Sequence, residues 1–260
     1  MATKDMRLEI VEGRSYKVVK ANEIVRKARY ELTITELKIL AYMISKVKPT
    51  DTALNEYTFS ISDFCRVCGI DYKSGRNYER MKHTLKAMRD KSFWLAQPDG
   101  SEVTVGWLGK AKLDKGSGKV TVRFDDDLQK YIVGLYSNYT QYELFCTLPL
   151  TSSYSFRMYE LLKSYQYKQE EFSQTFDIDD LKERLAAPYK NFKDFRIRAL
   201  EFATREINMY TDLQVSWEPI KESRRVIAVR FDVKQLDVLD RMDTIANAEE
   251  KLDGQMTLDL

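Results

Sequence analysis

The 260-residue sequence predicts an α+β fold in which one structural unit occurs twice. One observation is a repeated pattern: "LTITELKILAYMISK", "YTFSISDF" and "NYERMKHTLKAMRDKSF" have counterparts in "LTSSYSFRMYELLKS", "QTFDIDDL" and "DFRIRALEFATREIN". Another is the order of predicted elements in each half, which is helix, short strand, helix, long helix and hairpin. The third is a dense set of basic residues on each long helix. Together they predict tandem, pseudo-repeated winged helix-turn-helix domains.

The two halves stay in register over their middle segments. An offset of 117 residues aligns four pairs, namely Phe59 with Phe176, Ile61 with Ile178, Asp63 with Asp180, and Phe64 with Leu181. Leu85 and Leu200 align at an offset of 115, a drift that a difference in loop length explains. Such a long period belongs to a duplicated domain and not to a solenoid. We divide the chain into an N-terminal domain (1–138), a C-terminal domain (139–234) and an acidic tail expected to be flexible (235–260).

Each unit opens with a helix, and a short strand follows it. The predicted helices are Thr35–Lys46 and Ser152–Tyr165, and the strands are Tyr57–Ile61 and Ser173–Phe176. A second, short helix follows, with Ser62 or Asp179 as the expected N-cap, because these side-chain oxygens can accept the first free backbone N–H groups. This helix is expected to end near Gly69 in the first unit and before Pro188 in the second.

A long helix and a two-stranded hairpin, the wing, complete each unit. The long helices are Gly75–Lys91 and Asn191–Asn208, and the wing strands are Glu102–Lys112 with Lys119–Phe124, and Leu213–Pro219 with Arg225–Val233. Turns are expected at "PDG", "DKGSGK" and "IKESRR". "GSGK" also resembles part of a phosphate-binding loop, but Leu113 and Val120 stand where that motif needs Gly and Ser/Thr. A hairpin turn is therefore the better interpretation.

The long helices have one apolar and one basic face. At about 100° per residue, Phe195, Ala199 and Ile207 share a broad apolar arc, whereas Ile197 and Arg198 lie outside it and Arg196 lies at its margin. An α-helix fits the major groove of duplex DNA, where Arg pairs with guanine and Lys binds phosphate. The residues expected to bind DNA are therefore basic residues near the helix N-termini and on the wing tips: Lys73, Arg76, Arg80, Lys190, Lys193, Arg196, Arg198, Arg224 and Arg225. A solvated charged surface is the alternative for any one of these helices.

The charge distribution is consistent with a nucleic-acid partner. The whole chain has a net charge of +2. The last 26 residues contain seven acids and two bases, so residues 1–234 have 40 bases and 33 acids, a net charge of +7. A basic body with an acidic tail favours nucleic-acid binding.

The sequence contains no arrangement typical of an enzyme or a metal site. A structural zinc site usually needs four ligands, and only Cys146 and His83 accompany the pair Cys65 and Cys68. The two cysteines are therefore expected to pack as small residues on a short helix. With a single histidine, a hydrolase with a His base and a rolling-circle nicking enzyme with a histidine pair are both disfavoured. We expect no enzyme, no cofactor and no metal, and the absence of a signal peptide or a long apolar run predicts a cytoplasmic protein.

Three segments together resemble the plasmid replication initiators that bind iterons through two winged-helix domains. They are "VVKANEIVRKARYELTITELKILAYMI", "FCTLPLTSSYSFRMYELLKSY", and "KDFRIRALEFATREIN" with the following "TDL". The resemblance covers roughly Val18 to Val233. It implies binding of double-stranded DNA at origin direct repeats as a monomer, melting of nearby A·T-rich DNA, and recruitment of the host initiator and replicative helicase. It also implies a homodimer, in equilibrium with the monomer, that represses its own gene at an inverted repeat in the operator.

The resemblance also implies roles for individual residues. Asp194, Arg196 and Arg198 correspond to the main base-reading group, with Lys193 beside them. The N-terminal domain corresponds to the dimerisation module, so Arg76 and Arg80 are expected to make weaker DNA contacts. A transcription regulator built from the same modules is the alternative, and a repeat array beside the gene would distinguish the two.

The end of the chain, "DGQMTLDL", departs from this family pattern. The stretch from Asp243 is expected to be either a short helix or disordered, and Gly254 is expected to end any helix there. The spacing of Gln255, Met256, Leu258 and Leu260 resembles the short peptide by which replication proteins bind the sliding clamp. Clamp binding is thus a second hypothesis, with a chance motif as its alternative.

Overall fold

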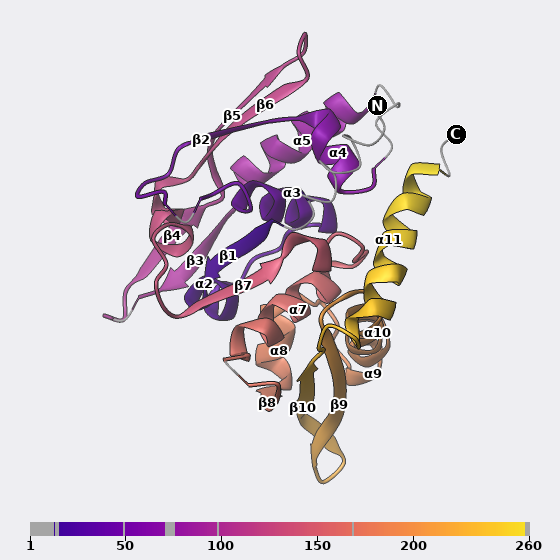
Figure 1. Ribbon diagram of the computed structural model, residues 1–260. Coiled ribbons are helices and arrows are strands. Elements are labelled where there is room, and N and C mark those ends of the chain that lie inside the picture. The colour runs from indigo at the N-terminus through magenta and orange to yellow at the C-terminus, as the bar shows by residue number, and fades with distance from the viewer. Residues whose placement is uncertain are drawn as a thin grey trace.

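The computed structural model describes Gly13 and residues 16–48, 50–70, 76–97, 99–167 and 169–257. It contains two winged-helix units, one above the other in Figure 1, with their wings pointing in opposite directions. The predicted fold class, an α+β protein with tandem winged helix-turn-helix domains, is confirmed.

The first unit has the predicted order of elements. Its helices are α3 (Ile34–Ile44), α4 (Ile61–Val67) and α5 (Asn77–Asp90), and its strands are β2 (Glu56–Ser60), β5 (Leu108–Asp114) and β6 (Lys119–Phe124). The strands form an antiparallel sheet in the order β2-β6-β5. Val120, Val122 and Phe124 alternate along β6 and are fully buried against the helices, which is the pattern of a sheet with one solvated face.

The second unit repeats this topology. Its helices are α7 (Ser153–Tyr165), α8 (Ile178–Arg184) and a long helix made of α9 (Phe192–Phe195), the π-helical segment η3 (Arg196–Glu201) and α10 (Phe202–Tyr210). Its strands are β8 (Glu171–Asp177), β9 (Leu213–Glu222) and β10 (Arg225–Gln235), in the order β8-β10-β9. The matching strand orders support the duplication inferred from the repeated pattern.

The N-caps of the two short helices differ from the prediction by two residues. Ser60, and not Ser62, accepts the backbone N–H of Asp63 at 3.0 Å. Asp177, and not Asp179, accepts the N–H groups of Asp179 and Asp180 at 2.9 and 3.1 Å. In both units the strand runs directly into the helix, so the last strand residue provides the cap.

Several short elements are additional to the predicted ones or divide them. They are β1 (Lys17–Ala21), α2 (Asn22–Lys27), β3 (Ser92–Ala96), β4 (Glu102–Gly106), η1 (Asp126–Leu128), α6 (Gln129–Ile132), β7 (Tyr139–Glu143) and η2 (Leu144–Cys146). The predicted single strand Glu102–Lys112 is instead β4 and β5, which belong to different sheets. The break falls at Trp107, which is 2% exposed and packs against Tyr30 and Phe93, at ring-centroid distances of 4.6 and 4.7 Å.

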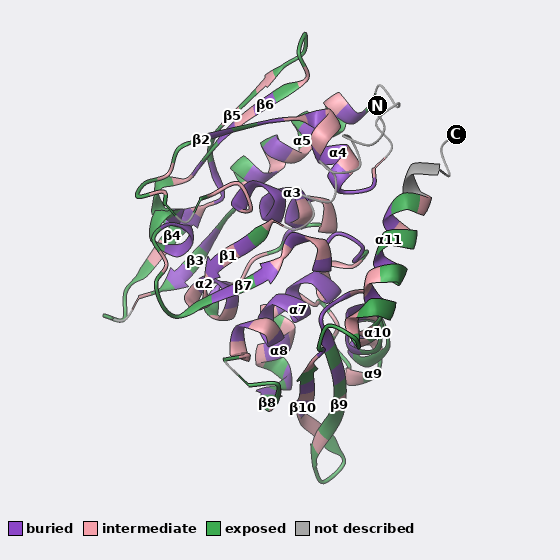
Figure 2. Ribbon diagram, in the orientation of Figure 1, coloured by how far each residue is buried: buried purple, intermediate pink, exposed green. Residues whose placement is uncertain are grey.

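Helix α7 lies at the centre of the molecule. It contacts α2, α3 and β7 as well as α10 of the second unit. Every residue from Ser155 to Leu162 is buried, and a helix buried all round belongs to an interior. The ribbon of α7 is accordingly coloured largely as buried in Figure 2. The boundary expected at residues 138 and 139 stays a prediction; strand β7, just beyond it, pairs with β1.

Charged groups are buried where α7 meets its neighbours. Lys20 on β1 forms an ion pair with Glu160 on α7, and these side chains are 4% and 2% exposed. Tyr142 on β7 donates a hydrogen bond to the same carboxylate. Burial lowers the pKa of Lys20, although Glu160 opposes the shift. The Arg157 guanidinium lies over the ring of Tyr30, 3.5 Å from its centroid.

The acidic tail is mostly a helix, which is one of the two alternatives expected for it. Helix α11 (Arg241–Thr257) continues through Gly254, where we had expected any helix to end. It packs against α10 and extends from there towards α4 (Figure 1). Ala248 and Leu252 are fully buried, and the Lys251 ammonium lies 4.3 Å from the centroid of the Tyr210 ring. Apolar residues at helical spacing thus anchor an otherwise acidic segment.

Helix α11 also touches the turn after α4. Gly69 has φ +66°, and a Cβ there would lie 2.5 Å from the backbone oxygen of Leu252. We expect Gly69→Ala to cost about 1–2 kcal/mol in left-handed strain and to displace α11 as well. Hydrogen exchange of the α11 amides should therefore accelerate.

The matched control is Gly134→Ala. Gly134 has φ +65°, but nothing lies within 4 Å of a Cβ placed there. This variant carries the same backbone strain without the contact, so exchange in α11 should stay at the wild-type rate. Equal α11 exchange in both variants would contradict the contact between α11 and the α4 turn.

Candidate nucleic-acid interface

The long helix of the second unit carries the main predicted site. Asn191 caps its start, because its side-chain oxygen accepts the Asp194 N–H at 2.8 Å. Phe195, Ala199, Leu200, Ala203 and Ile207 are fully buried, which fixes the helix against the core. Lys190, Lys193, Arg196 and Arg198 are exposed around its first turns, as predicted. These N-terminal turns are the part of a recognition helix that reaches base edges.

A π-helical turn shapes the exposed surface of this helix. Three consecutive residues, Arg196, Ile197 and Arg198, are exposed at the start of η3. Arg196 pairs with Glu201, five residues further on, at 3.4 Å. In an ideal α-helix two residues five positions apart lie about 140° apart around the helix axis. The wider π turn brings them onto one face and accounts for this pairing. Sequence reasoning missed Glu201, because a projection with 3.6 residues per turn places it away from Arg196.

Asp194 is placed differently from the arginines. It is half-buried, and its carboxylate accepts a hydrogen bond from the Asn191 side-chain amide at 2.8 Å. Asp194 therefore holds the capping side chain of Asn191 in place, and its carboxylate lies at the helix N-terminus, where the helix dipole stabilises negative charge. The expected base-reading role of Asp194 stays a prediction, and this geometry adds a capping role to it.

The wing of the second unit presents its basic residues at the tip. Arg224 lies in a tight turn next to Ser223, which has φ +56°, and both Arg224 and Arg225 are exposed. Arg225 lies 3.7 Å from the Asp179 carboxylate of α8, so the wing tip and the helix-turn-helix adjoin each other. Among the described residues, no ion pair engages Lys193, Arg198 or Arg224. These three cations remain available for phosphate or base contacts.

The first unit has a comparable basic surface on α5. Arg76 and Arg80 are exposed, as expected, whereas Lys73 lies outside the described residues. A pocket of about 410 Å³ lies between α5 and wing strand β5. It is lined by apolar and basic residues: Tyr78, Lys82, Leu85, Lys86, Arg89, Ala111 and Leu113. Lys82, Lys86 and Arg89 extend the predicted group towards the helix C-terminus. Lys86 pairs with Asp90 at 2.5 Å, which reduces the positive charge at that end.

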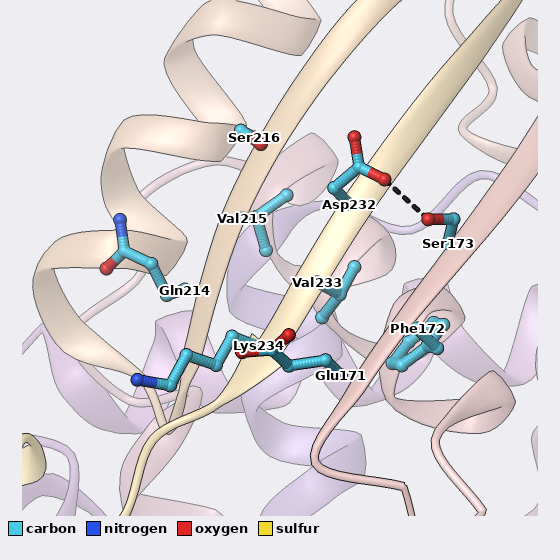
Figure 3. Close-up of a pocket in the computed structure, with 9 residues that line it drawn as sticks. All are labelled: Glu171, Phe172, Ser173, Gln214, Val215, Ser216, Asp232, Val233 and Lys234. Carbon is cyan, nitrogen blue, oxygen red and sulfur yellow. Dashed lines mark hydrogen bonds between the residues drawn. The ribbon is translucent and has the colours of Figure 1, made fainter.

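Another pocket, of about 380 Å³, lies on the outer face of the β8-β10-β9 sheet. Figure 3 shows the side chains that line it: Glu171, Phe172, Ser173, Gln214, Val215, Ser216, Asp232, Val233 and Lys234. Two of its charged groups, Asp232 and Lys234, form ion pairs within the protein, with Arg230 and Asp240 respectively. The Ser173 hydroxyl donates a hydrogen bond to the Asp232 carboxylate at 2.5 Å, and Arg230 also pairs with Asp232. These hydrogen bonds hold the pKa of Asp232 below its ordinary value.

The remaining predictions concern the cysteines, membranes and the clamp peptide. Cys65 and Cys68 are buried in the core, as expected for small packing residues. Within the described parts of the chain, no three His, Cys, Asp or Glu residues form a metal-binding group, and no helix is both long and apolar enough to span a bilayer. The clamp hypothesis stays a prediction: Gln255 and Met256 lie in α11, whereas Leu258 and Leu260 lie outside the described residues.

Comparison with known proteins adds two kinds of match. Residues 17–163 match the family described as initiator replication protein, WH1, and residues 177–233 match initiator Rep protein, WH2. The fold is similar to the crystal structure of Pi initiator protein in complex with iteron DNA, with a TM-score of 0.72 and 19% identity, covering 85% of this chain and 98% of that chain. The X-ray structure of the MSBI1.176 WH1 domain, from a replication protein isolated from a multiple sclerosis patient, matches with a TM-score of 0.31 and 14% identity, covering 38% and 77% of the two chains.

These matches bear on the fold and the family separately. The likeness to Pi initiator protein shows a shared two-domain fold. The WH1 match alone extends over more than half of the chain, and the WH2 match covers the second helix-turn-helix and its wing. The resemblance to plasmid replication initiators is thereby confirmed, and the chain belongs to the family of initiator replication proteins with WH1 and WH2 domains.

Proposed function

We propose that this protein initiates plasmid replication by binding the direct repeats of an origin as double-stranded DNA. The observation that carries the proposal is the exposed basic start of the long helix in the second unit, with Arg196 and Arg198 presented on it. The family match supports initiator activity, and the similar fold of a Pi initiator protein in complex with iteron DNA supports repeats as the ligand. The second unit reads bases, and the first unit adds contacts through α5.

The proposal includes finer steps that follow from family resemblance. The bound protein opens adjacent A·T-rich DNA and recruits the host initiator and replicative helicase. A dimer, in equilibrium with the monomer, binds an inverted repeat and represses the protein's own gene. The alternative remains a transcription regulator that binds DNA without opening it. Permanganate reactivity of thymines beside the bound repeats distinguishes the two, since only strand opening exposes them.

A footprint and a salt titration test the two-domain mode of binding. Two helices in successive major grooves should protect roughly two turns, about 20 bp. If about 6–10 phosphates are neutralised, log K should fall against log salt with a slope of roughly −5 to −9. DNase protection and fluorescence anisotropy at several salt concentrations measure these quantities.

The control for this test is Arg80→Ala, which changes the first unit alone. It should reduce the salt slope and leave the base preference unchanged, because a phosphate contact carries no sequence information. Protection of a single turn with a shallow slope in the wild-type protein would show that one domain binds and that the proposed mode is wrong.

A further inference from the structure

One exposed apolar side chain lies inside the basic surface of the second unit. Ile197 is 45% exposed, and its chain neighbours Arg196 and Arg198 are exposed as well. Single exposed apolar residues are common on protein surfaces and carry no meaning by themselves. The position of Ile197 differs because the two exposed arginines beside it are those proposed to read bases. An aliphatic group there enters the DNA groove together with them.

The π turn holds Ile197 in this position. η3 is π-helical from Arg196, and the Arg196 side chain pairs with Glu201 at 3.4 Å. Ala199 and Leu200, the next residues, are fully buried and fix the rotation of the helix. The Ile197 side chain is β-branched and therefore has few rotamers, so its order on binding costs little conformational entropy.

The chemistry of the major groove offers one matching partner. Guanine, adenine and cytosine present hydrogen-bonding groups there, and thymine alone adds an apolar C5-methyl group. An isoleucine cannot satisfy a hydrogen-bonding base edge, but it gains free energy by covering a methyl group. We propose that Ile197 is a specificity-determining residue that reads a thymine through its C5-methyl group, beside the bases contacted by Arg196 and Arg198. This inference rests on the proposed function, which brings the same helix into the groove.

A methyl deletion in the DNA tests the contact directly. The wild-type protein first selects a preferred duplex from a random library. In this duplex each thymidine in turn is then replaced by deoxyuridine, which lacks only the methyl group. At one position the wild-type protein should bind about fourfold more weakly, which corresponds to one buried methyl-sized group of ~0.8 kcal/mol. Ile197→Ala should bind the thymine and deoxyuridine duplexes equally at that position.

Met209→Ala is the matched control. Met209 is also an exposed apolar residue, 40% exposed, but lies at the opposite end of the same long helix. This variant should keep the fourfold sensitivity to deoxyuridine. The inference is overturned if no deoxyuridine weakens wild-type binding, or if the sensitive position stays sensitive in Ile197→Ala. If the library yields no preferred duplex at all, the proposed function fails first, and this inference fails with it.

Discussion

Replacing Arg196 and Arg198 together with alanine should lower the affinity for the preferred DNA site by about 2–6 kcal/mol, or roughly thirtyfold or more. Both side chains are exposed at the start of the reading helix, and a bidentate arginine contact with guanine discriminates by about 1–3 kcal/mol. Each single variant should relax the preference at its own base position. Binding-site selection with the variants, followed by anisotropy titrations, measures both effects.

Arg225→Ala is the comparison for these reading residues. Arg225 lies on the wing, partly engaged by Asp179 at 3.7 Å, and is expected to contact phosphate. Its loss should weaken binding to all sequences alike and reduce the salt slope by about one. Full affinity and unchanged selectivity in the Arg196 and Arg198 variants would mean that this helix face is only a solvated surface.

Glu160→Leu should reduce the free energy of unfolding by about 3–5 kcal/mol, because it leaves the Lys20 ammonium buried without its partner. The Tyr142 hydroxyl also loses its acceptor. Unfolding in urea, followed by circular dichroism, measures the loss as a lower midpoint at an unchanged slope. The more exposed pair of Lys17 on β1 with Glu143 on β7 provides the contrast, and Lys17→Met should cost less than about 1 kcal/mol.

A combined variant separates loss of the pair from loss of packing. Lys20→Met together with Glu160→Leu replaces both charged side chains by apolar side chains of similar volume. Such a replacement of a buried ion pair often leaves the free energy of unfolding unchanged. It should therefore recover most of the stability lost in Glu160→Leu. Equal destabilisation in the single and combined variants would show that packing around α7, and not the unpaired ammonium, accounts for the effect.

The repeated units were predictable because their signals are local. Helical and strand periodicities, a wing turn such as "DKGSGK", and matched apolar positions each depend on a few neighbouring residues. Burial of Phe195, Ala199 and Ile207 follows directly from this spacing. The exposed basic residues of the long helices were predictable for the same reason, since they occupy the opposite face.

The missed features depend on distant partners or unusual geometry. β1 and β7 are short, and their pairing joins Lys17 to Glu143 across 126 residues, which no local pattern reveals. Helix α11 is acidic, and its stability comes from burying Ala248 and Leu252 against the rest of the molecule. The π turn that brings Arg196 to Glu201 contradicts the regular helix on which the projection relied.

Helix α7 has a consequence for how the molecule unfolds. Its buried surface completes the packing of α2, α3 and β7 and also that of α10, and α11 adds a contact at Gly69. Neither winged-helix unit therefore has a closed core of its own. The two units should melt in one cooperative transition, so a destabilising lesion in the first unit also depopulates the reading helix of the second.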